Sequence, residues 1–261
     1  MLPAGTFMMG SPESEEDRKE WEGPVHQVTV RQPFAIGKYE VTRGQYAAFV
    51  NATGRKSDGC FFWDGEWKKD AARNWRSPGF PQTDKDPVVC VSQEDAKGYT
   101  EWLSRKTGLV YRLPGEAEWE YAARANTRSA RPWAGGADNA CGYANVHDRT
   151  SKRDSAFDWP SHDCDDGYAL TAPVGSIGAN AFGLHDMLGN VSEWLADCWN
   201  DSYANAPSDS NVWQVGDCQR RVLRGGSWSF GATAVRSASR VKSNSGEPST
   251  YSGFRIAKVL P

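Results

Sequence analysis

The 261-residue chain carries 30 lysine and arginine residues and 33 aspartate and glutamate residues, for a formal net charge of -3. These charges are dispersed and leave no basic stripe, which argues against a nucleic-acid partner. A hydrophobic content of 39% is typical of a globular chain, but the apolar runs are too short to cross a bilayer, so we expect no membrane span. No Pro- or Ser-rich linker interrupts residues 1–261, which predicts one domain.

The first segments with a clear period lie in the N-terminal half. Residues 26–30 (HQVTV) alternate between polar and apolar side chains and predict a strand. Residues 42–51 predict an amphipathic helix with Thr42 as its N-cap. Residues 92–107 predict a second one, because Ser92 is followed by an aspartate three positions later and apolar side chains then recur at helical spacing.

A third helix is predicted over residues 115–124, where apolar residues alternate with three glutamates. These are Glu116, Glu118 and Glu120. Because such positions do not share one face of a helix, a solvated face or salt bridges to Arg112 and Arg124 are favoured over acid–base catalysis. Residues 221–224 predict a short strand. Elsewhere Gly, Pro, Asn and Asp recur every few residues, which favours a loop-rich fold.

The cysteines indicate a compartment as well as a fold. There are six of them, without a Cys-x-x-Cys pair: Cys60, Cys90, Cys141, Cys164, Cys198 and Cys218. An even number favours disulfides and an oxidising environment, although the sequence leaves the pairing open and six buried free thiols are the alternative. If neighbours in the sequence pair, the loops close between 60 and 90, 141 and 164, and 198 and 218. We expect a periplasmic or secreted protein, with no signal segment visible in residues 1–7.

Seven segments together carry a specific family resemblance. They are PAGTFMMGS (3–11), GKYEVTRGQYAAFV (37–50), PVVCVSQEDA (87–96), YRLPGEAEWEYAAR (111–124), TAPVGSIGANAFGLHDMLGNVSEW (171–194), RVLRGGSW (221–228) and GFRIA (253–257). This set resembles the formylglycine-generating enzyme, or sulfatase-modifying factor, family. The resemblance implies that family's α+β, C-type-lectin-like fold, which is loop-rich, has few regular elements and binds structural calcium.

The family's catalytic cysteines have no counterpart in this chain. In the formylglycine-generating enzymes, two cysteines after Gly-Gly-Ser bind copper and activate oxygen. The matching positions here are Phe230 and Val235, and residues 228–261 contain no cysteine. Because both roles require a thiolate, the chain is not expected to activate sulfatases by that chemistry. An iron site like that of the related sulfoxide synthases is not expected either, since the four histidines form no i, i+4 pair.

The resemblance implies two structural calcium sites. The residues that match the first are Asn145, Val146, Asp166 and Tyr168, and those that match the second are Asp186, Gly189, Val191 and Glu193. Carboxylate and carbonyl oxygens are the ligands that calcium prefers. Asp186 replaces the asparagine expected at its position, but it keeps an oxygen and adds charge. The alternative is that these residues are solvated turn residues that cap loops.

Two kinds of function remain open. The first is that of PvdO, a member of the family without the cysteine pair, which works in the periplasm in the oxidative maturation of the pyoverdine precursor. It predicts a deep pocket near residues 227–240 for a small-molecule, peptide or protein ligand. The residues expected to contact that ligand are Trp228, Ser229, Phe230, Arg236 and Arg240. No catalytic residue can be named from the sequence.

The second kind is a non-catalytic binding protein. The variable proteins of diversity-generating retroelements use the same fold and diversify its C-terminal stretch, which corresponds here to a binding surface over residues 228–254. That interpretation predicts exposed side chains at the residues that such diversification can reach. They are Ser229, Phe230, Gly231, Ala232, Thr233, Ala234, Val235, Ser239, Val241, Ser243, Asn244, Ser249, Thr250 and Tyr251. A scaffold domain that binds a partner through the same groove is a third possibility.

Overall fold

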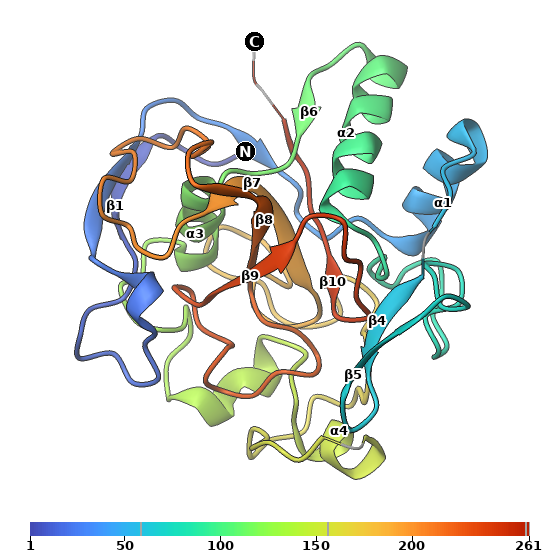
Figure 1. The fold of residues 1–261 in the computed structure, drawn as a ribbon. Helices are drawn as coiled ribbons and strands as arrows, with labels where there is room; N and C mark the ends of the chain where they lie inside the picture. The colour runs from blue at the N-terminus through green and yellow to red at the C-terminus, as the bar shows by residue number, and fades with distance from the viewer. Residues whose placement is uncertain (58, 156, 259, 261) are drawn as a thin grey trace.

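The computed structural model describes residues 1–57, 59–155, 157–258 and 260, and it has few regular elements among many loops (Figure 1). Within these ranges the α-helices are α1 (Arg43–Thr53), α2 (Gln93–Thr107), α3 (Glu116–Arg124) and α4 (Arg149–Asp154), with 3-10 turns at Glu20–Glu22 and Ala137–Gly142. The strands are β1 (Gly5–Met9), β2 (His26–Val30), β3 (Ala35–Ile36), β4 (Cys60–Trp63), β5 (Trp67–Asp70), β6 (Tyr111–Arg112), β7 (Ser192–Trp199), β8 (Asp217–Arg224), β9 (Arg240–Asn244), β10 (Ser252–Gly253) and β11 (Ala257–Lys258). This α+β architecture is the predicted one.

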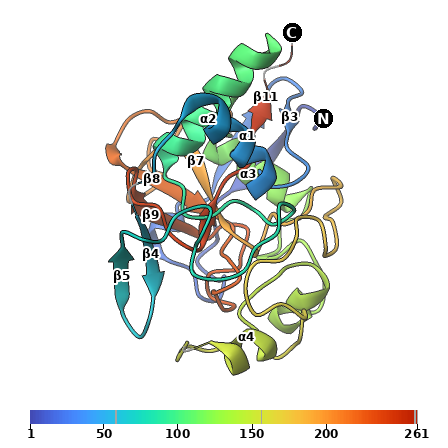
Figure 2. The same cartoon turned by 90° about the vertical axis from the view of Figure 1, so that its right-hand side faces the viewer.

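The strands form one central sheet and three smaller units. The central sheet has the order β10-β7-β8-β9, in which β7, β8 and β9 are antiparallel and β10 runs parallel to β7. A second sheet has the order β3-β11-β6, so the last strand lies between two from the N-terminal half. The β1–β2 and β4–β5 pairs are antiparallel ladders. Figures 1 and 2 place both termini at one end of the molecule and α4 at the other.

Local signals account for the helices, and all three predicted ones are present. The Thr42 and Ser92 side chains cap α1 and α2 through capping boxes, which satisfy backbone N–H groups that the first helical turn leaves free. Both helices end at glycines in the left-handed conformation, Gly54 and Gly108. The predicted strand at residues 26–30 is β2, and the one at residues 221–224 is the C-terminal half of the longer β8.

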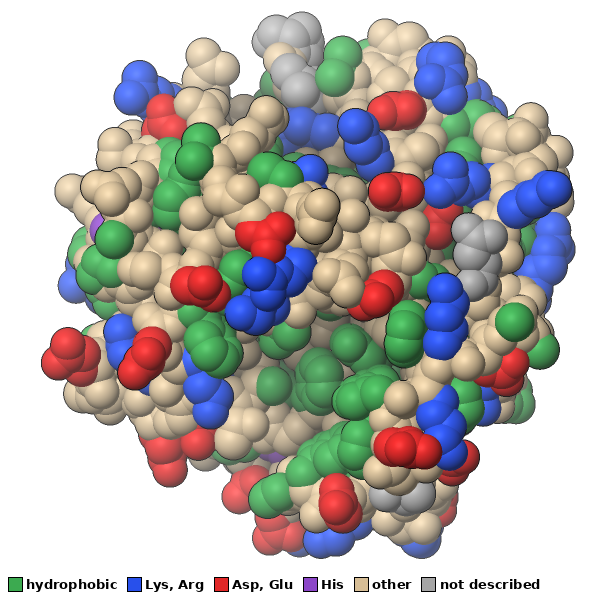
Figure 3. Space-filling view, viewed as in Figure 1, with side chains coloured by type: hydrophobic (Ala, Val, Ile, Leu, Met, Phe, Trp, Pro, Cys, Tyr) green, Lys and Arg blue, Asp and Glu red, His purple; other side chains and the backbone are tan. Residues whose placement is uncertain are grey.

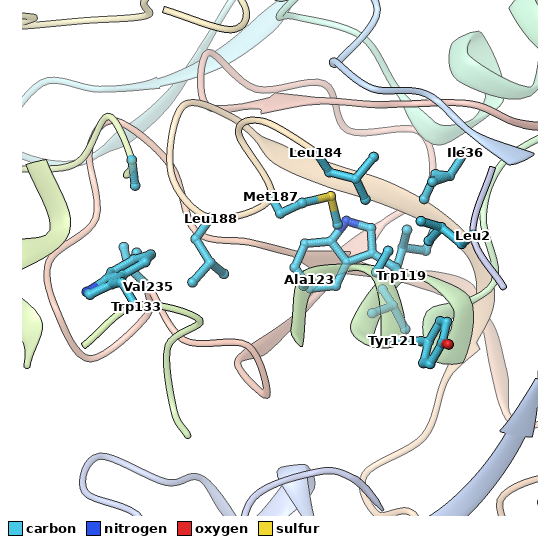
Figure 4. Packing of buried hydrophobic residues seen from close by; sticks show 14 of the residues in the cluster. Leu2, Ile36, Trp119, Tyr121, Ala123, Trp133, Leu184, Met187, Leu188 and Val235 are labelled. Carbon is cyan, nitrogen blue, oxygen red and sulfur yellow. The ribbon is translucent and has the colours of Figure 1, made fainter. Parts of the chain in front are cut away.

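The largest hydrophobic cluster packs between α3, β7 and the loops that follow. Figure 4 shows its members from close by, with the sulfur of Met187 beside the Trp119 ring. Trp119, Leu195 and Val222 are fully buried in it. A second cluster lies between α1, α2 and the central sheet, where Tyr46, Phe49 and Tyr99 contact one another through their rings. Aromatic packing therefore makes up much of the core.

Three disulfides join neighbouring cysteines in the sequence. They are Cys60–Cys90, Cys141–Cys164 and Cys198–Cys218, and no cysteine is free. This is the pairing that closes the shortest loops, and it removes the alternative of six free thiols. Such bridges indicate an oxidising, extracytoplasmic environment. None of the helices among the described residues combines the length and the apolar character needed to span a membrane.

The glutamates of α3 are buried, so the expectation of a solvated face is wrong, whereas the expected salt bridges are present. Glu118 pairs with Arg112 at 2.6 Å and Glu120 pairs with Arg124 at 2.8 Å. Glu116 pairs with Arg240 at 2.7 Å, a partner that the sequence did not indicate. All nine residues of α3 are buried because the helix packs between the β1–β2 ladder and β7. Because these carboxylates are buried, removing the partner of any one of them should lower the free energy of unfolding.

Candidate functional site

An aromatic groove opens beside Trp228. It encloses about 440 Å³ and is walled by Phe62, Trp63, Trp67, Phe80, Phe157, Trp228 and Tyr251. On the face shown in Figure 3, hydrophobic side chains line a hollow next to the β4–β5 hairpin and α4. Concave sites lined by aromatic side chains with a few polar groups are typical of ligand pockets. We name this feature the aromatic groove.

The β4–β5 hairpin forms one wall of the groove and is anchored at its base. The Cys60–Cys90 disulfide ties β4 to the loop before α2. The Phe61 N–H donates to the carbonyl of Pro248 at 2.9 Å, and the Phe61 carbonyl accepts from Thr250 N–H at 2.9 Å. Trp67 then projects from β5 with 46% of its surface exposed, 5.1 Å from the ring of Tyr251. The wall is therefore held against the C-terminal loop that carries Tyr251.

Trp228 forms the inner wall because of the two glycines before it. Gly225 and Gly226 have positive φ angles of 97° and 71°, which side chains rarely adopt. A Cβ at Gly226 would also lie 3.0 Å from a methyl group of Val235. The turn brings Trp228 between Phe80 and Phe157, each with a ring centroid 5.7 Å away. Of the residues predicted to contact a ligand, Trp228 and Ser229 line the groove, whereas Phe230 does not.

Two polar groups beside the groove lack a hydrogen-bond partner within the described ranges. The Trp63 indole N–H and the Ser155 hydroxyl are buried and have no hydrogen-bond partner among the described residues. Both residues line the groove, where a buried donor without a partner is costly. Either group would have to turn toward the cavity before a ligand oxygen could bond to it. The lining itself suits an aromatic group.

His147 lies behind the groove wall. Its ring packs edge-on against Phe157 at 5.2 Å, and its Nδ1 lies 2.8 Å from the Ser151 hydroxyl. Burial lowers the pKa of His147, so the imidazole is neutral at pH 7. A backbone hydrogen bond with Trp159 acts on this pKa in the opposite direction. The imidazole is fully buried and does not itself line the groove.

The positions of the family's cysteines are occupied by packing residues. Val235 is completely buried and belongs to the main core cluster shown in Figure 4. Phe230 is half-buried and packs against Tyr251, with ring centroids 5.3 Å apart. The six cysteines of the chain are all in disulfides. No described thiol is therefore positioned to replace the missing pair.

Arg236 and Arg240 are not ligand contacts, which corrects the prediction from sequence. Arg236 is 1% exposed and pairs with Glu22 at 2.6 Å and Glu15 at 2.5 Å. Arg240 is also 1% exposed and holds Glu116 through two nitrogens at 2.7 and 2.8 Å. Neither arginine lines the aromatic groove. Their guanidinium groups neutralise buried carboxylates from distant parts of the chain instead.

The C-terminal stretch presents few exposed side chains, which disfavours a diversified binding surface over residues 228–254. Of the residues named for that interpretation, Thr233, Val241 and Asn244 are exposed. Phe230, Ala232, Ala234, Ser243 and Tyr251 are half-buried, and Ser229, Gly231, Val235, Ser239, Ser249 and Thr250 are buried. A surface that tolerates many side chains needs them to face solvent. The same stretch instead contributes Trp228, Ser229, Thr250 and Tyr251 to the lining of a cavity.

The residues expected at the first calcium site are brought together. Asp166 accepts hydrogen bonds from the N–H groups of Val146 and Tyr168, both at 2.8 Å. The side-chain oxygen of Asn145 is buried and has no partner among the described residues. A second carboxylate, from Asp148, lies within 4.8 Å of Asp166. Burial raises the pKa of Asp166 to about 7. The Asp148 and Asp166 carboxylates and the unpartnered Asn145 oxygen are hard donors of the kind that calcium prefers.

The residues expected at the second site lie in a buried acidic cluster. Asp186 and Glu193 are buried together with Glu40, a residue that sequence analysis did not identify. Burial raises the pKa of all three carboxyl groups. Arg255 pairs with Glu193 at 2.6 Å, but no cation among the described residues lies within ion-pair distance of Glu40 or Asp186. Three carboxylates with one guanidinium leave an excess of negative charge, which a divalent cation would offset.

Several groove residues escaped the sequence analysis although a local signal was present. The segment CFFWDGEW (60–67) places Asp64-Gly65 between aromatic residues, and such a dipeptide between apolar runs is a strong hairpin signal. Gly65 has a φ of 72°, as that turn requires. Phe157 and Phe80 had no comparable signal, because each comes from an irregular loop. Glu40 had none either, since one acidic residue before a helix is usually exposed.

Comparisons with known proteins agree with this architecture. The profile of the sulfatase-modifying factor enzyme 1-like domain matches residues 1–260. The formylglycine-generating enzyme of Thermomonospora curvata is 33% identical over 98% of this chain and 91% of its own length. The structure of PvdO from Pseudomonas aeruginosa is 39% identical, with a TM-score of 0.85, over 99% of this chain and 93% of that one. Treponema denticola variable protein 1, 21% identical with a TM-score of 0.72 over 98% of this chain and 93% of that one, shares the fold.

Proposed function

This chain belongs to the sulfatase-modifying factor, or formylglycine-generating enzyme, family, and on that premise we propose that it is a PvdO-like periplasmic maturation factor. Its substrate is a peptide or siderophore precursor that binds in the aromatic groove. The observation that carries the proposal is the groove itself, a cavity of about 440 Å³ beside the position where the family's cysteines are replaced. Identity of 39% to PvdO over nearly the whole chain supports the same assignment.

We also propose that the chain does not use the family's copper chemistry. Copper binding and mixed-disulfide formation both need thiolates, and every cysteine here is bridged. Phe230 and Val235 offer only hydrocarbon side chains at the matching positions. The contribution of this chain to an oxidative maturation step is therefore to bind and orient the precursor and to exclude water from it.

The chemistry of the groove defines the part of the substrate that enters it. Aromatic rings pack well in offset and edge-to-face arrangements, and Trp67, Tyr251 and Trp228 offer such surfaces on three sides. Trp63 and Ser155 carry buried polar atoms without a partner among the described residues, and a turn of these side chains toward the groove would bring them to an oxygen acceptor on the ligand. A phenol ring attached to a peptide combines both properties. We propose that a tyrosine-derived ring of the precursor occupies the groove.

Replacing Trp67 by alanine should weaken binding by about 30-fold, which corresponds to a loss of roughly 2 kcal/mol for an aromatic anchor. Trp67 is 46% exposed, so its removal should leave the fold intact. The measurement is saturable quenching of tryptophan fluorescence by a short tyrosine-containing peptide, compared with the same peptide carrying alanine instead.

The matched control is Tyr39→Ala, which removes an aromatic side chain of similar exposure, 39%, outside the groove. The tyrosine peptide should bind this variant as it binds the unaltered protein. Two results would argue against a ligand ring in the groove. One is equal affinity of the unaltered protein for the tyrosine and alanine peptides, and the other is an equal loss of affinity for the tyrosine peptide in Trp67→Ala and Tyr39→Ala.

Calcium is the proposed structural cofactor. Asn145, Val146, Asp166 and Tyr168 would hold one ion, and Asp186, Gly189, Val191 and Glu193 the other. The orphaned Asn145 oxygen supports the first site, and the excess of buried carboxylates around Glu40 supports the second. Bound calcium would supply the positive charge that these buried acids lack and would fix the loops on which Trp228 rests. Trp228 N–H donates to the carbonyl of Asn190, within the second of these loops, at 2.9 Å.

A further inference from the structure

A second cavity, of about 700 Å³, lies between α2, β7 and β8. It shares no lining residue with the aromatic groove. Both cysteines of the Cys198–Cys218 disulfide line it, together with Gln93, Lys97 and Arg221. A disulfide that forms part of a cavity wall is accessible to a small molecule, which a buried structural bridge is not.

The three disulfides differ in access and in electrostatic surroundings. Cys218 is exposed, whereas Cys198 is 1% exposed. Cys60 and Cys90 are 0% and 2% exposed, so a thiol from solution cannot reach their sulfurs. The sulfur of Cys141 lies 3.8 Å from a carboxylate oxygen of Asp148, which disfavours any thiolate there. The Cys198–Cys218 bridge differs from the other two in both respects. It includes an exposed cysteine, Cys218, and neither of its sulfurs contacts a carboxylate among the described residues.

Arg221 lies beside this bridge, in a cavity that is also lined by Glu94, Glu101, Lys97 and Arg112. Its Nη1 lies 3.3 Å from the sulfur of Cys198 and donates to the carbonyl of Ala196 at 2.8 Å. Within the described ranges, no carboxylate lies within ion-pair distance of Arg221, and its buried Nε has no partner. A guanidinium without a counter-charge stabilises a thiolate at Cys198 and attracts an incoming one.

We infer that Cys198–Cys218 is a thiol-exchange site that reacts with a small-molecule thiol. The thiolate attacks the exposed sulfur of Cys218, the disulfide breaks, and Cys198 leaves as a thiolate beside Arg221. The product is a mixed disulfide on Cys218, so one S–S bond forms as one breaks. A second thiolate then attacks the small-molecule sulfur of the mixed disulfide. In sum, two thiols lose two electrons and two protons, and the protein gains a dithiol.

Opening this bridge would release residues 199–217 from the end of the central sheet. That loop carries Tyr203, which is 2% exposed and donates its hydroxyl to Glu116 at 2.9 Å. The Tyr203 N–H also donates to the carbonyl of Gly23 at 2.7 Å. Exchange at the disulfide would therefore loosen contacts between the loop and the N-terminal segment. The inference does not depend on what binds in the aromatic groove.

The test exposes the folded protein to reduced glutathione as the probe, quenches samples in acid at intervals and maps the cysteines by differential alkylation and mass spectrometry. We expect glutathione on Cys218 and a free thiol on Cys198, while the other two bridges remain closed. Earlier opening of Cys60–Cys90 or Cys141–Cys164, glutathione on Cys198, or no opening at all would overturn the inference.

The role of Arg221 is tested by Arg221→Met, with Arg220→Met as the matched control. Arg220 lies on the same strand and pairs with Asp217, and it does not line the cavity that holds the disulfide. Exchange should slow by roughly ten-fold in Arg221→Met, because the leaving thiolate loses its counter-charge, and should be unchanged in Arg220→Met. Equal rates in the unaltered protein and Arg221→Met would contradict the assignment of Arg221.

Discussion

Removing calcium should lower the melting temperature of this protein by on the order of 10 °C for each site. A ligand that binds only the folded state, at a free concentration about a thousand times its Kd, adds roughly 4 kcal/mol to the free energy of unfolding. For a chain of this length, each kcal/mol changes the melting temperature by roughly 2–4 °C. The comparison is thermal unfolding in excess EGTA and in millimolar calcium at matched ionic strength and pH.

Two variants assign the calcium effect to the first site. Asp166→Ala removes a proposed ligand. Calcium should therefore raise the melting temperature of this variant less than that of the unaltered protein. Asp163→Ala removes a carboxylate three positions away that is exposed and pairs with Arg149, so it should respond to calcium as the unaltered protein does. A melting temperature that does not change on chelation would argue against both sites, and one that magnesium restores as well as calcium would argue against calcium as the cofactor.

Replacing Arg236 by methionine should lower the free energy of unfolding by about 3–5 kcal/mol, the usual cost of leaving a buried charge unpaired. Arg236 holds Glu22 through two nitrogens, at 2.6 and 2.9 Å, and Glu15 at 2.5 Å. Glu22 is 1% exposed, so without Arg236 its carboxylate has neither water nor a cation. Denaturant unfolding followed by tryptophan fluorescence measures the difference in the free energy of unfolding between Arg236→Met and the unaltered protein.

An exposed ion pair provides the control for Arg236. Arg149→Met breaks the pair with Asp163, whose side chains are 61% and 74% exposed, and should cost no more than about 1 kcal/mol. Arg236→Lys keeps the charge but loses the two-nitrogen contact, so its stability should lie between those of the unaltered protein and Arg236→Met. If Arg236→Met were as stable as Arg149→Met, the buried ion pair would contribute little to the fold.

The sequence predicted what depends on near neighbours. The caps at Thr42 and Ser92 act within one helical turn, and the alternation at residues 26–30 reflects one strand, so both could be read directly. The α+β family fold came from seven segments taken together. The disulfide pairing also proved local, because each bridge joins consecutive cysteines.

What the sequence did not predict depends on contacts between distant segments. Arg236 and Glu22 are 214 positions apart, and Arg240 and Glu116 are 124 apart, so neither ion pair leaves a local pattern. Both arginines were therefore misassigned to a ligand groove. The groove itself is built from six separate stretches of chain, and only Trp228 and Ser229 among its residues were predicted as ligand contacts. Its aromatic residues could equally have belonged to the core.

The most direct test of the proposed function is the metabolite profile of the native host after deletion of the gene. We expect a peptide or siderophore precursor to accumulate in its more reduced form. The unaltered gene and Tyr39→Ala should restore the mature product, whereas Trp67→Ala should restore it poorly. An unchanged set of secreted peptides and siderophores after deletion would contradict the assignment of this chain as a PvdO-like maturation factor.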